Sequence, residues 1–328
     1  MKRFGPGEHV ALRLLKLREE TLEEKHERTR TKASPWRLGG LGPIGLARRV
    51  YGQVDEDEVL TRSAALSYYF VFALFPMLFF LITMMGFLAQ SGNLQAGLFG
   101  YAERVLPPDA FSLLQKTLKE ISRQASGLKL AFGLVLALWS ASGGVSSIMD
   151  ALNRCYHVKD GRPFVKRKLI SIGLTIALSA LVILALVMVL YGNDIARFVG
   201  VHTGLSDVTI RAWQVGQWAL AFFLVVSSFA LLYYYGPDVK QHWRWITPGS
   251  LVGVIAWVAA SYAFRVYLHY FNSYSKTYGS VGAVILLLLW LFISGMAILL
   301  GGEINSEIEN AAAQRGHPEA KPEGRKAA

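Results

Sequence analysis

Charged residues and cysteines are both scarce in this sequence, and each scarcity excludes a class of protein. Charged residues make up 17% of the chain, against about 25% in a typical soluble domain, so the surface of an ordinary soluble enzyme is missing. Cys155 is the only cysteine, which excludes a framework of intrachain disulfide bonds. HExxH, HxH, GxSxG and P-loop patterns are also absent. We therefore expect no cofactor and no metal site, and we predict that the protein is not an enzyme.

Six long uncharged intervals account for the missing charge. They contain 40, 20, 25, 26, 20 and 26 residues, and a helix needs roughly 20 apolar residues to cross a bilayer core of about 30 Å. The intervals are continuously apolar, without the alternation of a membrane β-strand. The sequence therefore predicts an all-α integral membrane protein with six transmembrane helices. The predicted helices cover about residues 64–89, 130–152, 168–191, 211–235, 246–270 and 279–306.

The distribution of lysine and arginine predicts the orientation. The segment before the first helix, the loops after the second and fourth helices and the C-terminal tail together hold 25 of these residues, and the opposite side holds seven. Basic residues accumulate on the cytoplasmic side of inner-membrane proteins, so both termini are predicted to be cytoplasmic. This placement explains the net charge of +11 without nucleic acid. The expected partners are membrane lipids, a second copy of the chain, or another envelope protein.

The chain divides into three regions by composition. Residues 1–43 form a charged cytoplasmic extension that ends in a glycine-rich linker, and residues 44–310 form the membrane domain. Residues 44–54 suit a short helix on the anionic inner leaflet. Residues 311–328 are predicted to form a disordered cytoplasmic tail. We expect no cleaved signal peptide, and a free thiol at Cys155 in a reducing compartment.

External loop 1 is predicted to contain one or two amphipathic helices. Phe111, Leu114, Leu118 and Ile121 recur at helical spacing, and charged residues fill the positions between them. These helices either cap the helical bundle or lie on the outer leaflet.

Several small or helix-bending residues lie within the predicted spans. Small side chains let membrane helices approach closely, and a proline frees a backbone carbonyl in the preceding turn. These residues serve either tight packing or a polar pathway between helices. They are Pro76, Ser140, Gly143, Gly144, Ser147, Gly249 and Gly253.

Polar residues near the helix ends form two candidate sites. The cytoplasm-side candidate contains Asp150, Asn153, Asp238, Glu303 and Asn305, with Arg62 and Ser63 at the same depth. Carboxylates at helix C-termini need compensation, so this site is predicted to be either a hydrogen-bonded latch or a gate that holds a proton or cation. The external candidate contains Arg265, His269 and Tyr278, although Arg265 also suits simple snorkelling to the outer headgroups.

The sequence resembles the YihY/BrkB family of bacterial inner-membrane proteins. The matching stretches keep the family's order over about residues 55–310. They are Ala64–Tyr69 through Pro76, Leu138–Gly143 through Asn153, Gly236–Asp238, Pro248-Gly249, Thr277–Ser280 and Gly301–Asn305. The resemblance implies a six-helix inner-membrane protein and supplies no catalytic residues, although some members were once labelled ribonucleases.

Three functions compete at this stage. Polar and glycine-rich helices suggest a transporter or lipid-handling protein of unknown substrate. The alternative is an envelope interaction or assembly protein without transport activity, suggested by the charged N-terminus and the amphipathic external loop. An enzyme acting on RNA or lipid headgroups is the third possibility, and the missing acid–base and metal motifs argue against it.

Overall fold

The computed structural model describes residues 34–88, 127–203, 207–270, 273–317 and 319–326. All the regular structure in these residues is helical, which confirms the all-α prediction. A 3₁₀ helix and seven α-helices follow one another in these described ranges. They are η1 (Pro35–Gly40), α2 (Pro43–Glu56), α3 (Val59–Leu88), α6 (Gly127–Cys155), α7 (Phe164–Thr203), α8 (Asp207–Tyr235), α9 (Trp243–Tyr270) and α10 (Ser273–Gln314).

Each predicted membrane span coincides with one of the six long helices, and all six helices start earlier in the chain than predicted. Within the described residues, four helices contain stretches long and apolar enough to cross a membrane. These stretches are Phe164–Val189, Trp213–Tyr235, Trp243–Tyr270 and Val284–Gln314. The protein is therefore a multi-pass membrane protein. The charged extension up to residue 33 and the amphipathic helices of external loop 1 lie outside the described residues.

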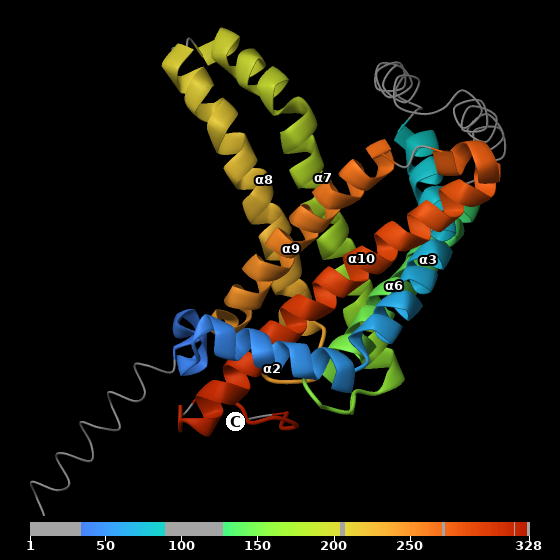
Figure 1. Cartoon of the computed structure of the whole chain (residues 1–328). Coiled ribbons are helices and arrows are strands. Elements are labelled where there is room, and N and C mark those ends of the chain that lie inside the picture. Colours follow the sequence, from blue (N-terminus) through green and yellow to red (C-terminus); the bar gives the residue numbers. More distant parts are fainter. Residues whose placement is uncertain (1–33, 89–126, 204–206, 271–272, 318, 327–328) are drawn as a thin grey trace, which may run out of the picture.

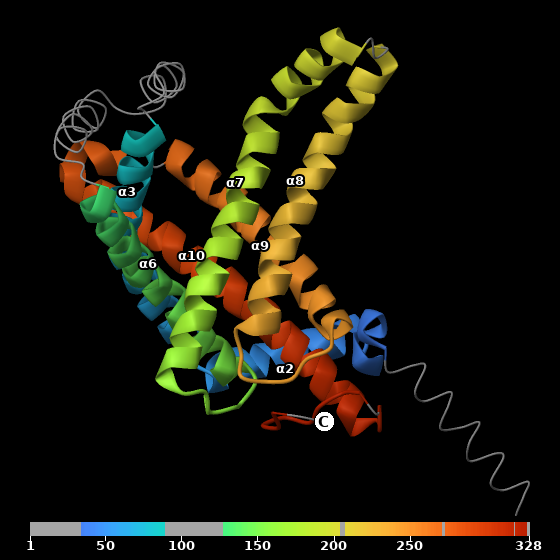
Figure 2. The ribbon, with the colours of Figure 1, turned by 180° about the vertical axis from the view of Figure 1, so that it is seen from behind.

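The helices form two groups that meet at one end of the molecule (Figure 1). One group is the α7–α8 hairpin, and the other contains α3, α6 and α10, with α9 packed on both α8 and α10. The hairpin diverges from α3 and α6 towards its tip, as both views show (Figure 2). Helix α2, the α6–α7 connection, the α8–α9 connection and the end of α10 gather where the two groups meet. We call this end the closed end.

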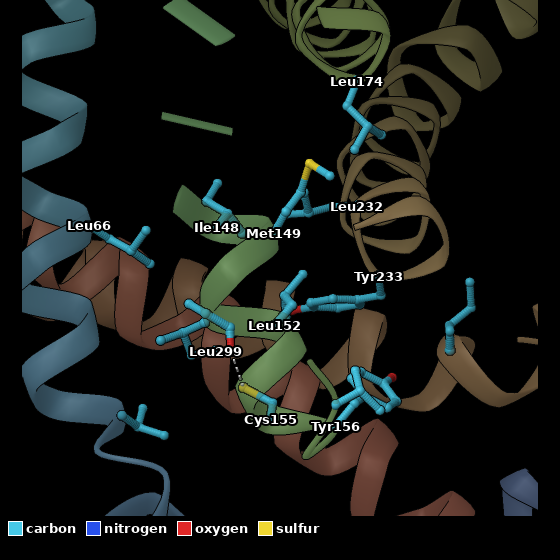
Figure 3. Close-up of a cluster of buried hydrophobic side chains, with 14 of the residues drawn as sticks. Leu66, Ile148, Met149, Leu152, Cys155, Tyr156, Leu174, Leu232, Tyr233 and Leu299 are labelled. Carbon is cyan, nitrogen blue, oxygen red and sulfur yellow. Dashed lines mark hydrogen bonds between the residues drawn. The ribbon is translucent and has the colours of Figure 1, made fainter. Parts of the chain in front are cut away.

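A single apolar cluster holds the two groups together at the closed end (Figure 3). Leu66 from α3, Leu152 from α6, Leu232 and Tyr233 from α8, and Leu299 from α10 meet there. A separate cluster of Ala185, Ala221 and Leu224, together with the side chains packed on it, joins α7 only to α8. The hairpin is thus fixed to the other helices in its inner half and packs on itself in its outer half.

Helices α9 and α10 cross through glycine residues. A Cβ atom on Gly301 would lie 2.8 Å from the carbonyl oxygen of Gly249, so the two backbones approach too closely for any larger residue. A Cβ atom on Gly253 would lie 3.4 Å from the carbonyl oxygen of Ala297 in the same contact. The hydroxyl of Tyr233 donates a hydrogen bond of 2.7 Å to the carbonyl of Ile298, which ties α8 to this crossing.

The other small residues have varied surroundings. Gly144 faces Phe70 and Ala73 of α3, whereas Gly143 has open space around it and Ser140 is exposed. Ser147 donates a hydrogen bond to the carbonyl of Gly143 within its own helix. Only one side of this stretch therefore reaches a neighbouring helix, because residues spaced along a helix spread around its axis. Pro76 lies within α3, and its side chain lies outside the described part.

The chain after α10 is packed, which corrects the prediction of a disordered tail from residue 311. We call its described residues, 315–317 and 319–326, the C-terminal segment. Helix α10 continues to Gln314, and the chain then folds back over the closed end. Ala320 joins an apolar cluster with Trp245 and Ile308, and Lys321 is 5% exposed. The composition of the tail resembles that of a disordered segment, but the bundle supplies apolar and acidic partners that bury it.

Helix α2 lies across the closed end with two different faces. Leu46 and Val50 are buried in the cluster that contains Ile308 of α10. Ile44 and Tyr51 are 86% and 81% exposed on the outer side. This arrangement fits the predicted amphipathic helix, and its contact with the inner leaflet stays a prediction.

Candidate functional site

Two buried carboxyl groups meet at the closed end. Asp57 and Glu303 are each 1% exposed, and each carboxyl group is a neighbour that acts on the ionisation of the other. Asp57 directly follows α2, and Glu58 reverses the chain into α3 with a φ of 53°. That turn directs Asp57 inward, towards Glu303 on α10. We call this pair the acidic pair.

Basic side chains lie around only one member of the acidic pair. Nε of Arg154 and Nε2 of His157 lie 3.2 Å and 3.3 Å from Oδ1 of Asp57, and Nε of Arg62 donates to the Asp57 backbone carbonyl at 3.0 Å. His157 follows the end of α6 and adopts a φ of 52°. Burial raises the pKa of Asp57, and His157 and Arg154 partly offset this effect.

Glu303 has a different environment. Its two side-chain oxygens, like those of Asp57, receive no hydrogen bond within the described part of the chain. Unlike Asp57, Glu303 also forms no ion pair there. The buried thiol of Cys155 lies beside it, but donates to the carbonyl of Ala151 at 3.4 Å. Burial raises the pKa of this thiol well above its usual value, so Cys155 is a neutral neighbour.

A second polar cluster joins the α6–α7 and α8–α9 connections. Oδ1 of Asn153 accepts a hydrogen bond of 2.6 Å from the Asp238 backbone amide. Nδ2 of Asn153 donates to Asp160 at 3.3 Å, and Nη2 of Arg162 lies 2.8 Å from the Asp160 carboxylate. Burial alone would raise the pKa of Asp160, but hydrogen bonds from Arg162 outweigh it and lower that pKa. This cluster is an ionised, hydrogen-bonded connection between loops.

The C-terminal segment adds a buried ion pair to the same end. Nζ of Lys321 lies 3.1 Å from Oε1 of Glu309, and both side chains are 4% exposed. The Lys240 amide donates a 2.8 Å hydrogen bond to the carbonyl of Lys326. Oε1 of Glu323 lies 3.3 Å from Nε2 of His157, so the segment reaches the surroundings of the acidic pair.

The predicted cytoplasm-side residues do not form one cluster, which corrects the expectation that they converge. Asp150 is exposed and pairs with Arg167, whereas Glu303 points into the bundle. Oδ1 of Asn305 accepts a hydrogen bond of 2.7 Å from the Gly249 amide at the α9–α10 crossing. Asn153 and Asp238 belong to the loop cluster. These residues come from different helices and connections, so their side chains meet different neighbours.

The two candidate residues at the start of α3 also have separate roles. Ser63 is buried and donates a 2.7 Å hydrogen bond to the carbonyl of Val59 within α3. Arg62 forms an ion pair of 3.2 Å with Glu58, besides its contact with the backbone of Asp57. Only Arg62 therefore borders the acidic pair.

The external candidates remain dispersed within the described part. Arg265 and His269 are exposed on α9, and the His269 ring contacts Tyr270 at a centroid distance of 5.5 Å. The side chain of Tyr278 lies outside the described residues.

Sequence reasoning missed Asp57 and His157. Asp57 belongs to the acidic run Asp55–Glu58, and such a run is typical of the start of a helix. Asp55, Glu56 and Glu58 are exposed and only Asp57 is buried. Four consecutive acidic residues directly before an apolar helix could have indicated a site here. The sequence does not indicate which of the four side chains turns inward.

The comparisons with known proteins agree with the earlier resemblance. A family model described as virulence factor BrkB matches residues 50–325. The ribonuclease-like protein YfkH of Bacillus subtilis (strain 168) is 34% identical over 263 residues, which cover 80% of this chain and 94% of that protein. No solved structure matches the chain significantly.

More distant relatives are longer than this chain. A UPF0761 membrane protein of Stenotrophomonas maltophilia (strain R551-3) is 25% identical over 272 residues, covering 81% of this chain and 61% of the relative. A UPF0761 membrane protein of Xanthomonas oryzae pv. oryzae (strain PXO99A) is 26% identical over 288 residues, covering 84% and 63%. The chain thus spans less than two thirds of the length of these two relatives.

Proposed function

The chain belongs to the virulence factor BrkB family of membrane proteins, and from this premise we propose that it is a six-span inner-membrane protein that binds and handles lipid. Both termini are proposed to be cytoplasmic. The observation that carries the lipid assignment is the divergence of the α7–α8 hairpin from the other helices (Figure 1).

The surface of the diverging hairpin suits acyl chains better than polar solutes. Between residues 176 and 189, Ser179 is the only polar residue. Exposed side chains along the two helices are large and apolar, for example Ile183, Val215 and Phe223. A polar solute would need hydrogen-bond partners to replace water, whereas an acyl chain needs only apolar contact. Lipid entering from the bilayer between the two helix groups is therefore the substrate class that this surface supports.

The proposed orientation is supported by the gathering of basic segments at the closed end. Helix α2 with Arg48 and Arg49, the α6–α7 connection and the C-terminal segment lie there together. Reporter fusions test it directly. A reporter that works only in the cytoplasm is expected to be active when it is fused after residue 160. A reporter that works only outside the cytoplasm is expected to be active when it is fused after residue 115. The reverse pattern contradicts the orientation.

The lipid proposal is tested with the purified full-length protein. Native mass spectrometry is expected to show phospholipid that remains bound after detergent exchange. Vesicles containing the protein are expected to exchange a headgroup-labelled fluorescent phospholipid between leaflets faster than vesicles containing heat-unfolded protein. A protein that retains no lipid and leaves the exchange rate unchanged contradicts the proposal.

The same divergence favours a second candidate, an envelope assembly protein. Large exposed side chains such as Trp218 and Phe223 on α8 also suit contact with a helix of another protein. This candidate predicts a stable, lipid-free oligomer or complex in the same mass spectra. That result, with no acceleration of lipid exchange, would select it over lipid handling.

A further inference from the structure

We propose that Asp57 and Glu303 together form a proton-binding site that joins the start of α3 to α10. The inference goes beyond lipid handling and does not depend on it. The ligand is a single proton held between the two carboxyl groups.

The first argument is the geometry of two acceptors. Asp57 and Glu303 are each 1% exposed, so water does not solvate them. An ionised carboxylate only accepts hydrogen bonds, and two ionised carboxylates repel strongly when buried side by side. One proton turns one carboxyl group into a donor, so the pair then makes a hydrogen bond in place of a repulsion.

The second argument is the missing partner of Glu303. Both of its oxygens lack a donor in the described part of the chain, and no ion pair involves it there. The guanidinium groups of Arg154 and Arg62 and the imidazole of His157 are all placed around Asp57. One negative charge on the pair is thus compensated, and a second would have no cation beside it.

The remaining titratable groups around the pair do not remove this deficit. Glu307 follows one turn later on α10 and pairs with Arg49 at 3.7 Å. Glu323 of the C-terminal segment contacts His157 from the other side. Cys155 on α6 is a neutral thiol. Two of these groups add negative charge, so the surroundings favour uptake of a proton by the acidic pair.

Loss of the proton is expected to weaken the contact between α3 and α10. Asp57 is fixed to α6 and to the segment after it by Arg154 and His157, whereas Glu303 is fixed only by its position in α10. Repulsion between the two carboxylates would therefore push α10 away from the α2–α3 turn. The contact at the closed end becomes dependent on pH in this way.

Infrared spectroscopy of the full-length protein in lipid nanodiscs tests the proposal. A protonated carboxyl group has a C=O stretching band separate from that of a carboxylate. The wild-type protein is expected to show this band at neutral pH and to lose intensity on alkaline titration. Because other buried acids add to the band, the decisive quantity is the difference between wild type and Glu303→Gln.

The substitutions Glu303→Gln and Asp57→Asn are each expected to remove one carboxylic-acid band at neutral pH. Glutamine keeps the shape and donor capacity of a protonated glutamate, so the Glu303→Gln protein is expected to fold. Asp160→Asn is the matched control, since Asp160 is ionised by Arg162, and it is expected to leave the band unchanged. A wild-type spectrum without the band, a band unaffected by Glu303→Gln, or a band equally reduced in the control overturns the proposal.

Discussion

The α9–α10 crossing predicts a large effect of a single methyl group at Gly249. A Cβ atom there would lie 2.5 Å from Cγ of Asn305 and even closer to the carbonyl oxygen of Gly301. Both helices must then separate, and the 2.7 Å hydrogen bond from the Gly249 amide to Asn305 is lost. Overpacking costs about 2 kcal/mol, the unpaired buried amide about 2 kcal/mol, and the better helix propensity of alanine returns about 1 kcal/mol. Gly249→Ala is therefore expected to lower the free energy of unfolding by about 3 kcal/mol.

Gly143→Ala is the matched control for this experiment. Gly143 also lies inside a long helix, but a Cβ atom there meets nothing within 4 Å. Alanine is therefore expected to stabilise the protein by up to about 1 kcal/mol through helix propensity alone. Both variants are compared with wild type by reversible unfolding in mixed detergent micelles. Equal stability of the two variants would refute the reasoning from backbone contact.

The closed end supports two further predictions. Lys321→Met leaves the carboxylate of Glu309 buried without its cation, so the free energy of unfolding is expected to fall by about 3–5 kcal/mol. Lys326→Met, which breaks an exposed pair with Asp238, is expected to cost less than about 1 kcal/mol, and denaturant titration compares the two variants. Burial would raise the pKa of Asp238, but hydrogen bonds from Lys326 and the Gly161 amide lower it below 3.8. Its stabilising contribution is thus present above the unfolded pKa and is lost as the pH falls through the lower folded value. Asp238→Asn is therefore expected to be less stable than wild type near neutral pH, and this difference is expected to disappear only once the pH lies below the folded pKa of Asp238. A constant difference between these proteins at every pH would exclude that assignment.

The long helices were predictable because membrane spans are a local property of the sequence. An uncharged stretch such as residues 169–193 carries enough apolar side chains to define a helix without reference to the rest of the chain. Helix ends were less predictable. Helix α7 begins at Phe164, before the basic residues Lys166 and Lys168 that bounded the predicted span. Charged residues end the apolar interval but are good helix formers, so the helix continues through them.

The candidate site was only partly predictable because its contacts are non-local. Glu303 was recognised as an acid near a helix end, but its partner Asp57 lies 246 positions earlier in the chain. Asp150 and Asn153 lie three residues apart on nearly the same face of α6, but different segments pack beside them. Asp150 pairs with Arg167 of α7, whereas Asn153 accepts a hydrogen bond from the Asp238 amide of the α8–α9 connection. The C-terminal segment was expected to be disordered because its composition lacks large apolar residues. Burial of Lys321 depends on Glu309, which no composition rule can anticipate.

The separate packing of the outer hairpin gives this protein a long lever arm. Leu178 is the last residue of α7 packed against the shared apolar cluster, and the helix continues from there to Thr203. At a rise of about 1.5 Å per residue this arm is about 38 Å long, so a tilt of about 10° moves its far end by about 7 Å. Such a tilt leaves the contacts of Ala185, Ala221 and Leu224 intact, because they join only the two helices of the hairpin. A small rearrangement at the closed end is thereby amplified across the full depth of the membrane.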